Sequence, residues 1–494
     1  MSNIKIGWSE VSLVPKDRKV RLFGQFYERI SGEVETPISA TGLAIESDND
    51  CVIFVASDLI AVSHNLLDEV RARLPESFPK DKLITSAIHT HTSIGYPGYS
   101  DTLNDIRELL ESMLPEGMRY KPLVSDDAPD LLFGNEAREF IIERIVKAAI
   151  SAWENRKEAC YATGFGRAAV GMCRRACYDD GSAKMWGDTN SANFTELESG
   201  NDSGIEMLFT YGLDKKLTGV VVTVACPAQV LEHNNFISSD YMGKLKRLIR
   251  EKYGDGVNLL GLIAPAGDMC PRDLIRWVDA EFELKDPNIY REKIIPRRAD
   301  PSMFDIKGCE KVAKRIANEV FWALDEVAEY VTEAPLIHKN IMLDLPLRRV
   351  TPKEYEASLN AINNYIERHT GDATYEDNAK LQIHTGNVRR YMLQQTKDMF
   401  DAEIHVLRLG DVAFATSPFE LFINYGNQIR ARSLAKQSFL VQLSCGCFTY
   451  LPTEKAEKGS HYSAFIGSGM AGHEAGDILV RKTLSEINSL FEEI

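Results

Sequence analysis

The chain has 494 residues, 44% hydrophobic and 26% charged, which is the composition of a globular protein with room for a large core. Its formal net charge of −15 excludes the extended basic surface that nucleic-acid binding usually requires. No window reaches 18 uninterrupted apolar residues, so neither a membrane-spanning helix nor a stable membrane association is expected.

The cysteines and the first residues bear on the cellular compartment. Nine cysteines, an odd number, are scattered along the chain, and the sequence opens with MSNIKIGWSE instead of a basic and then apolar leader. Unpaired thiols are typical of a reducing environment. We therefore expect a cytoplasmic protein, and the sequence leaves open whether it forms a homo-oligomer.

Apolar runs and amphipathic stretches alternate three times in the order strand, helix, strand. The first unit has strands over 51–58 and 82–89 around a helix over 63–74. The other two units have strands over 218–226 and 257–268 with a helix over 239–254, and strands over 409–418 and 438–450 with a helix over about 420–435. A helical crossover joins parallel strands, so the carboxyl ends of each pair lie at one edge of a sheet.

Long helical patterns separate these units. Apolar stripes at helical spacing over 137–156 and 309–331 predict helices that cover a sheet. A polar stretch over about 352–400 predicts a helical hairpin, as a lid or a subunit contact. The sequence thus predicts a mixed α/β fold, with parallel and mixed sheets built from repeated strand, helix, strand units and flanked by helices.

Seven side chains with metal-binding or acid-base chemistry lie at the ends of the expected strands. Imidazole, thiolate and carboxylate groups are the ligands that zinc prefers. Extended backbone sends residues two positions apart to one side, so two of the seven, His89 and His91, could address one ion. If the units share a sheet or face one another, the whole set converges: Asp58, His89, His91, Cys226, Asp268, Glu420 and Tyr450.

Each of these residues also has a structural explanation. An isolated His-x-His pair more often forms hydrogen bonds near a turn than it binds a metal. A single cysteine is more often a small buried side chain than a ligand, and acidic residues cap turns and helix N-termini. No nucleophile elbow, P-loop or dinucleotide fingerprint follows a strand, so metal-dependent hydrolysis is the leading hypothesis.

The segment HTHTSIGYPGY, which begins at His89, resembles the His-Thr-His-Ser-Gly-Pro-x-Gly-Tyr segment of the neutral ceramidase family. VIFVASDLIAVS, APAGDMCPR, LRLGDVAFATSPFELF and YLPTEKA are similar to further segments of that family, in the same order. The resemblance runs from about residue 4 to residue 490. It implies a single ceramidase-like catalytic domain over 1–494, with a helical insertion at about 352–400.

What the resemblance implies is a zinc-dependent amidase whose metal ligands include His89, Glu420 and Tyr450. His91 falls on an acid/base position beside the metal, and Arg174 falls on an arginine of the family's site. Asp268 is placed with this catalytic group, where it and Asp58 would orient the ligands.

The sequence departs from the family at three places near the inferred pocket, one of which is the Thr-Ser-Ile that replaces Ser-Gly-Pro after the two histidines. A second zinc histidine of the family, followed by proline, is replaced by Cys226. Because thiolate is a competent zinc ligand, we expect the metal set His89, Cys226, Glu420 and Tyr450, with His233 as the alternative to the cysteine. Cys270 stands where the family has serine, and this change puts the substrate in doubt more than the fold.

Together these observations predict a Zn2+ hydrolase that cleaves an amide, or a related bond, of a small polar substrate by activating a water molecule. An acidic chain without a membrane anchor favours such a substrate over ceramide itself. One alternative is a metal-dependent lyase, epimerase or glycoside-cleaving enzyme that acts on a sugar derivative. A second is a catalytically inactive binding protein in which Cys226 marks a lost metal site.

Overall fold

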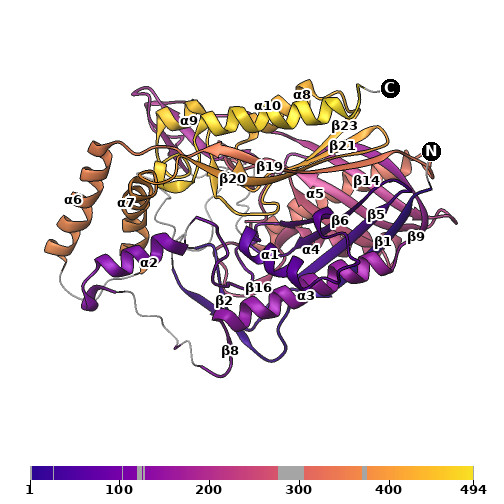
Figure 1. Ribbon diagram of the computed structural model, residues 1–494, viewed down its shortest axis with the longest axis horizontal. Helices are drawn as coiled ribbons and strands as arrows, with labels where there is room; N and C mark the ends of the chain where they lie inside the picture. Colours follow the sequence, from indigo (N-terminus) through magenta and orange to yellow (C-terminus); the bar gives the residue numbers. More distant parts are fainter. Residues whose placement is uncertain are drawn as a thin grey trace.

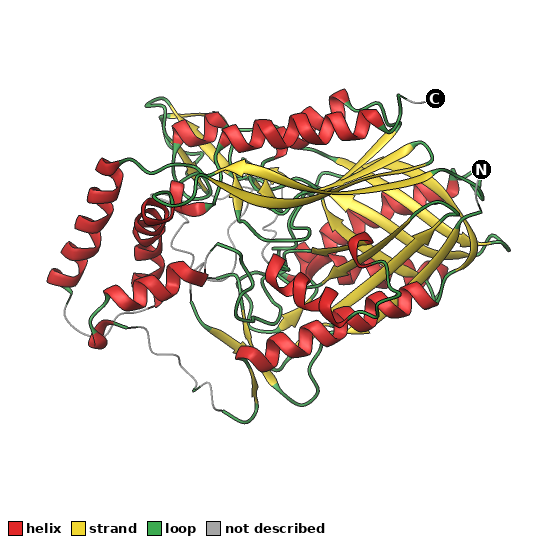
Figure 2. Ribbon diagram, viewed as in Figure 1, coloured by secondary structure: helices red, strands yellow, loops and turns green. Residues whose placement is uncertain are grey.

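The fold is known from a computed structural model, drawn in Figures 1 and 2. It describes the whole chain except residues 1–2, 26, 103, 120–124, 126–127, 276–304, 370–374 and 493–494. Strands and helices alternate through the chain, and parallel and antiparallel pairings occur in the same sheets, so the predicted mixed α/β class is confirmed.

An eight-stranded sheet forms the larger layer. The outermost pair of strands at each edge is parallel, and all the pairs between them are antiparallel. The sheet curls so far that its first strand contacts its last three. In order across the sheet, the strands are β17 Asn258–Ile263, β15 Leu217–Val224, β14 Gly204–Gly212, β9 Lys157–Arg167, β1 Lys5–Ser12, β5 Ser39–Glu46, β6 Cys51–Ser57 and β7 Leu83–Ala87.

A four-stranded sheet packs against the larger one. It consists of β19 Leu336–Pro346, β20 Met399–Leu409, β21 Val412–Thr416 and β23 Gln437–Val441, in that order. Strand β23 contacts β14, β15 and β17, while α10 His473–Ser489 lies along the outer face of the small sheet (Figure 1). One apolar cluster contains residues of both sheets, such as Phe54 and Phe414, so the two layers share a core.

Helices bury one stripe each against these layers. Helix α3 Gly134–Glu154 packs on β1, β5 and β6 through a row that includes Ile141, Ile145 and Ala148. Burying each isoleucine of this row stabilises the fold by roughly 1.5–3 kcal/mol. Helix α5 Ile306–Asp325 packs on β9 and α4. The remaining helices of the main body are α1 His64–Arg73, α4 Asp240–Tyr253, α8 Ile423–Arg432 and α9 Glu454–Gly459.

Two helices, α6 Pro352–Arg368 and α7 Tyr375–Leu393, occupy the region where the sequence predicts a helical insertion. Helix α6 begins with a capping box between Thr351 and Glu354, and its proline at the first position is already shaped for a helix start. Helix α2 Asn104–Met113 packs against α7. These three helices lie at one end of the molecule, beyond the sheets (Figure 1).

Short strands complete the architecture around the sheet edges. They form the small sheets β3-β2-β8, β16-β4, β10-β18, β12-β11-β13 and β22-β24. Their bounds are β2 Lys19–Leu22, β3 Arg29–Ser31, β4 Val34–Thr36, β8 Leu131–Leu132, β10 Met172–Cys173, β11 Arg175–Tyr178, β12 Ala183–Met185, β13 Phe194–Leu197, β16 Ile237–Ser238, β18 Met269–Cys270, β22 Glu420–Leu421 and β24 Tyr450–Leu451.

The three predicted strand, helix, strand units are present, and each pairs its strands in parallel: β6 with β7, β15 with β17, and β21 with β23. The third unit differs in detail from the prediction. Its helix begins at Ile423, and its last strand ends at Val441 instead of running to Tyr450. After Val441 the backbone takes positive φ at Leu443 and Cys445, and this conformation ends the extended strand before Tyr450.

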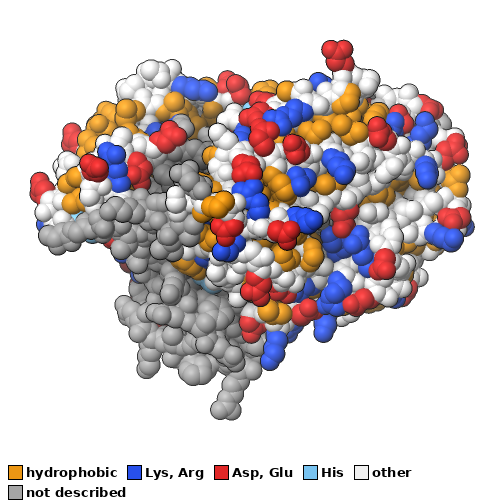
Figure 3. Space-filling view, turned by 90° about the horizontal axis from the view of Figure 1, so that it is seen from below, with side chains coloured by type: hydrophobic (Ala, Val, Ile, Leu, Met, Phe, Trp, Pro, Cys, Tyr) orange, Lys and Arg blue, Asp and Glu red, His pale blue; other side chains and the backbone are white. Residues whose placement is uncertain are grey.

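No helix in the described ranges is long and apolar enough to cross a membrane. On the face seen in Figure 3, acidic and basic side chains are interspersed over the surface that is coloured.

Candidate metal and catalytic site

The strand ends of the three units meet in space. Backbone hydrogen bonds join each pair of units, among them Ala228 N to Ile88 O at 3.1 Å, Gln442 N to Ile263 O at 2.9 Å, and Ala87 N to Leu443 O at 3.3 Å. The three units therefore contact one another near their strand ends, although one unit belongs to a different sheet from the other two.

His89 and Glu420 face each other at this junction, and both are buried. His89 Nδ1 lies 2.7 Å from the carbonyl oxygen of Ile60, which can only accept, so the proton of a neutral ring is on Nδ1. His89 Nε2 then presents a lone pair to Glu420 Oε2 at 3.5 Å. Two ligands of one tetrahedral zinc ion are about 3.3 Å apart, so this pair of facing acceptors fits a shared cation.

The backbone at His89 is strained, with φ of 64° just beyond β7. A left-handed conformation at a residue other than glycine costs about 1–3 kcal/mol and persists where the surroundings over-determine it. Here it turns the chain sharply after the strand and brings the imidazole to Glu420. The strain therefore supports a functional role for this histidine.

Tyr450 and Arg174 lie beside this pair. Tyr450 is the parallel partner of Glu420 in the short β22-β24 sheet, which sets the phenol next to the carboxylate. Arg174 Nη2 donates to Tyr450 Oη at 3.3 Å and to Gly267 O at 2.8 Å. Burial, followed by the charge of Glu420, raises the pKa of Tyr450 well above its usual value, so a phenolate here needs a cation to stabilise it.

The buried Arg174 guanidinium stays charged. Burial opposes its charge, but the nearby Tyr450 and Glu420 raise its pKa above the ordinary value. Its Nε has no hydrogen-bond partner among the described residues. A fixed, charged donor beside two candidate ligands can stabilise negative charge that develops on a reacting oxygen.

His91 packs its ring edge-to-face against His89, with ring centroids 4.9 Å apart. Burial is the main cause that lowers the pKa of His91 well below its usual value, and the neighbouring His89 and Arg29 add to it. The neutral ring approaches Gly24 so closely that a Cβ there would lie 2.4 Å from its Cγ and Nδ1. Glycine at position 24 thus makes room for the imidazole.

Cys226 is buried in an apolar cluster on the β15 side of the site. Its Sγ faces the carbonyl oxygens of Val170 at 3.5 Å and Pro227 at 3.6 Å. Burial, and then the proximity of Cys270, raises the pKa of the Cys226 thiol well above its usual value. Among the described residues, Cys226 belongs to no group of three histidine, cysteine or acidic ligand atoms within 4.8 Å of one another. A thiolate ligand would therefore require deprotonation of this buried thiol.

His233 and Cys270 lie in the surroundings of the site. His233 Nδ1 is 3.2 Å from Tyr27 Oη, and its Nε2 is 3.4 Å from Glu232 Oε1. The Cys270 thiol contacts the carbonyl oxygen of Arg272 at 3.2 Å, and burial raises its pKa to about 12. Glu232 therefore links His233 to His91. The Cys270 thiol stays protonated at neutral pH.

Asp268 is a buried residue that organises the chain near Glu420. It accepts hydrogen bonds from Ser199 Oγ at 2.6 Å and from the backbone N–H of Ile423 at 2.8 Å. The second bond fixes the first residue of α8, three positions after Glu420. Asp268 therefore holds the chain that carries a candidate ligand.

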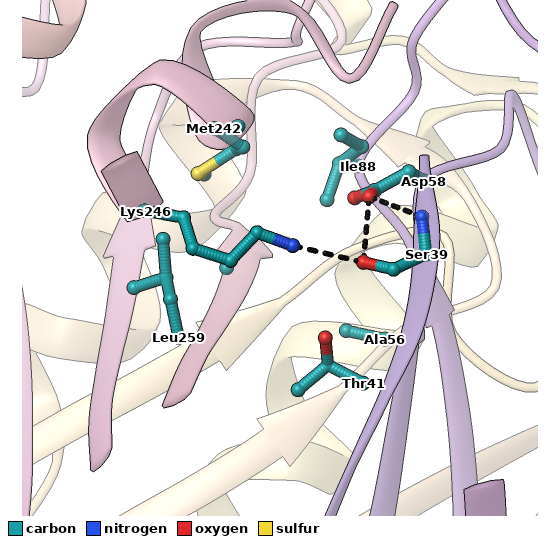
Figure 4. A pocket seen from close by; sticks show the side chains of 10 residues that line it. Ser39, Thr41, Ala56, Asp58, Ile88, Met242, Lys246 and Leu259 are labelled. Carbon is teal, nitrogen blue, oxygen red and sulfur yellow. Dashed lines mark hydrogen bonds between the residues drawn. The ribbon is translucent and has the colours of Figure 1, made fainter. Parts of the chain in front are cut away.

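Asp58 has a different environment, shown in Figure 4. Its carboxylate accepts from Ser39 N at 2.7 Å and Ser39 Oγ at 3.1 Å, and it lines a cavity of about 10 Å³ together with Lys246. Lys246 donates to the same serine hydroxyl at 3.1 Å. Asp58 therefore orients Ser39, and burial raises the pKa of Asp58 to about 6.

The effect of Asp58→Asn on the free energy of unfolding is expected to depend on pH: it should be more favourable at pH 8 than at pH 4 by about 2 kcal/mol. The folded-state pKa of Asp58 lies above the unfolded value, so the cost of ionising the buried carboxyl is absent at low pH and complete above about pH 6. Urea denaturation of both proteins from pH 4 to 8 measures this. A difference in the free energy of unfolding that does not change with pH would contradict it.

A second group of ligand-type side chains lies elsewhere, between β20 and α1. Ligand atoms of Glu403, His405 and Cys445 lie within 4.8 Å of one another, which makes this a possible metal-binding group. However, Arg71 donates to both Glu403 oxygens, at 2.8 and 2.5 Å, and His405 Nε2 lies 2.7 Å from Oε1. A cation would have to displace the guanidinium, so the His89 and Glu420 pair fits a metal better.

The sequence motifs missed four residues around the site. Tyr462 packs its ring edge-to-face on Tyr450, with centroids 5.6 Å apart. Gln25, Gln229 and Glu232 surround His91. For Gln229 and Glu232 a signal existed, because these polar residues follow closely after β15; Gln25 and Tyr462 come from loops distant in sequence.

The architecture is that of the ceramidases among proteins of known structure. A structure described as neutral ceramidase from Pseudomonas aeruginosa aligns with a TM-score of 0.67 and 14% identity, covering 100% of this chain and 75% of that one. A structure described as ceramidase complexed with C2 aligns with a TM-score of 0.66 and 12% identity, covering 100% and 76%. At this identity the likeness establishes a shared fold. No protein-family model and no curated protein matches the sequence.

Proposed function

We propose that this protein is a zinc-dependent hydrolase that cleaves an amide, or a related bond, of a small polar substrate. The observation that carries the proposal is the facing pair of acceptors, His89 Nε2 and Glu420 Oε2, 3.5 Å apart beside Tyr450 and Arg174. Imidazole, carboxylate and phenol oxygen make a donor set suited to zinc. The fold shared with proteins described as ceramidases supports amide hydrolysis.

Three protein ligands are sufficient for a catalytic zinc site, which keeps its fourth position for water. We propose His89, Glu420 and Tyr450 for these positions. A zinc ion held there would act as a Lewis acid and lower the pKa of a water molecule to about 7. Cys226 and His233 are then not required as ligands.

The other polar residues would act on the substrate and on protons. Arg174 would donate to the oxygen of the substrate carbonyl as negative charge develops on it. His91 would accept the proton of the attacking water and return it to the leaving nitrogen. Asp268 would hold Glu420 in place through its hydrogen bond to Ile423 N.

Cys226→Ala is expected to retain zinc at the wild-type stoichiometry, because the buried, protonated thiol lies among apolar side chains. Metal analysis of the purified variant after dialysis against Zn2+ tests this, with Cys309→Ala, another buried thiol in the same apolar cluster, as the control. Loss of zinc from the Cys226 variant alone would restore the cysteine as a ligand.

Hydrolysis itself is tested by incubating the zinc-loaded protein with a panel of N-acyl amino acids, N-acyl amino sugars and ceramide, and detecting products by mass spectrometry. We expect release of a free amine from one of the small polar substrates. An active preparation that holds no metal would overturn the mechanism, and cleavage of ceramide alone would overturn the substrate class.

A further inference from the structure

Gln229 lies between His91 and Arg174 and is fully enclosed by the site. Its amide nitrogen is 2.6 Å from His91 Nε2, and its amide oxygen is 3.5 Å from Arg174 Nη1. A guanidinium can only donate, so the amide oxygen must face the arginine. The orientation of the Gln229 amide is therefore fixed, with its NH2 group toward the imidazole.

This orientation decides where the proton of His91 resides. An amide NH2 group can only donate, so His91 Nε2 must be an acceptor, and the single proton of the ring is on Nδ1. On that side, Nδ1 faces an acceptor, Glu232 Oε2, at 3.5 Å. The Gln25 amide nitrogen lies 3.4 Å from Nδ1 and 3.0 Å from the same Glu232 oxygen, and the shorter contact, to the carboxylate, is the one in which it donates. Donors and acceptors therefore alternate from Arg174 through Gln229 and His91 to Glu232.

We propose that Gln229 is a positioning residue that selects the Nδ1–H tautomer of His91 and directs the Nε2 lone pair toward the Arg174 side of the site. The chemical use of that lone pair rests on the proposed hydrolase function. A base takes a proton from water through an unprotonated nitrogen, and for that step the water must replace the Gln229 NH2 group at Nε2. The opposite tautomer would present an N–H group there and could not act as a base.

Neighbouring groups restrict the movement of the His91 ring. The backbone of Gly24 packs against one face, where even a Cβ would overlap the ring. Arg29 Nη2 donates to the backbone oxygen of His91 at 2.6 Å and so holds the main chain. The tautomer is thus set by the polar neighbours of a fixed ring, of which Gln229, at 2.6 Å, is the nearest.

The test is 15N NMR of the full-length protein, as purified, with labelled histidine, because imidazole nitrogen shifts distinguish the two tautomers. His91→Asn identifies the His91 signals among the ten histidines. We expect wild-type His91 to be unprotonated at Nε2. In Gln229→Glu the carboxylate can only accept, so a proton should appear on Nε2; in Gln229→Ala both tautomers should be populated.

Gln394→Glu is the matched control, a buried glutamine bonded to Val350 on a different element, and it should leave the His91 signals unchanged. A wild-type ring protonated at Nε2, or an unchanged tautomer in Gln229→Glu, would overturn the proposal. In the activity assay, Gln229→Glu should lower kcat strongly with little change in KM, and Gln229→Ala should lower it only a few-fold, in proportion to the fraction of His91 that carries its proton on Nε2. If no substrate is cleaved, the hydrolase function fails while the NMR result still decides the role of Gln229.

Discussion

Glu403→Gln is expected to lower the free energy of unfolding at pH 7 by about 3–5 kcal/mol, the cost of breaking a buried ion pair. Glu403 is almost fully buried and takes two hydrogen bonds from Arg71 and one from His405. An amide at this position removes one acceptor and leaves the Arg71 charge without its counterion. Chemical denaturation followed by circular dichroism measures the loss.

The same substitution should change how stability depends on pH. Burial raises the pKa of Glu403, but hydrogen bonds from Arg71 and His405 outweigh this and hold the pKa below its usual value. The stabilisation is therefore complete above the unfolded-state pKa, about 4.3, and is lost as the pH falls below it. The variant should lose less stability than the wild type between pH 5 and 3.

A control lies two residues farther along the same helix α1. Arg73 forms a similar two-pronged contact with Glu139, but that pair is exposed to solvent. Glu139→Gln should change stability little, because water screens an exposed ion pair. Equal effects of the two substitutions would show that burial does not decide the contribution of Glu403.

Glu420→Gln is expected to reduce zinc affinity by at least about 100-fold and to abolish hydrolysis. The amide keeps the shape of the side chain but removes the negative charge that faces His89 Nε2. Zinc titration with a competing chelator measures the affinity, and the substrate panel measures the activity. His89→Asn should behave in the same way.

Cys445→Ala separates this site from the group at Glu403, since the thiol belongs only to the latter. We expect this variant to bind zinc as the wild type does. If instead Cys445→Ala lost zinc and Glu420→Gln kept it, the metal would belong to the Glu403 group, and the proposed mechanism would be wrong.

Local sequence determined much of the fold. Each strand, helix, strand unit was readable because alternation and helical periodicity are properties of consecutive residues, and β6 and α1 match their predicted ranges within a residue or two. Parallel pairing followed from the crossovers, so it was also predictable that His89 follows one strand of a parallel pair, β7, and that Glu420 follows a strand of another, β21.

Only the tertiary structure decided which polar side chains meet. The curl of the large sheet and the packing of β23 on it bring the three units together, and no local pattern encodes that contact. In the folded protein Asp58 contacts Ser39, and Cys226 is buried among apolar side chains. Gln229 lies between His91 and Arg174. The sequence by itself therefore determined the units and the candidate residues. Their geometry depends on side chains from distant segments, whose positions are set by packing and not by spacing along the chain.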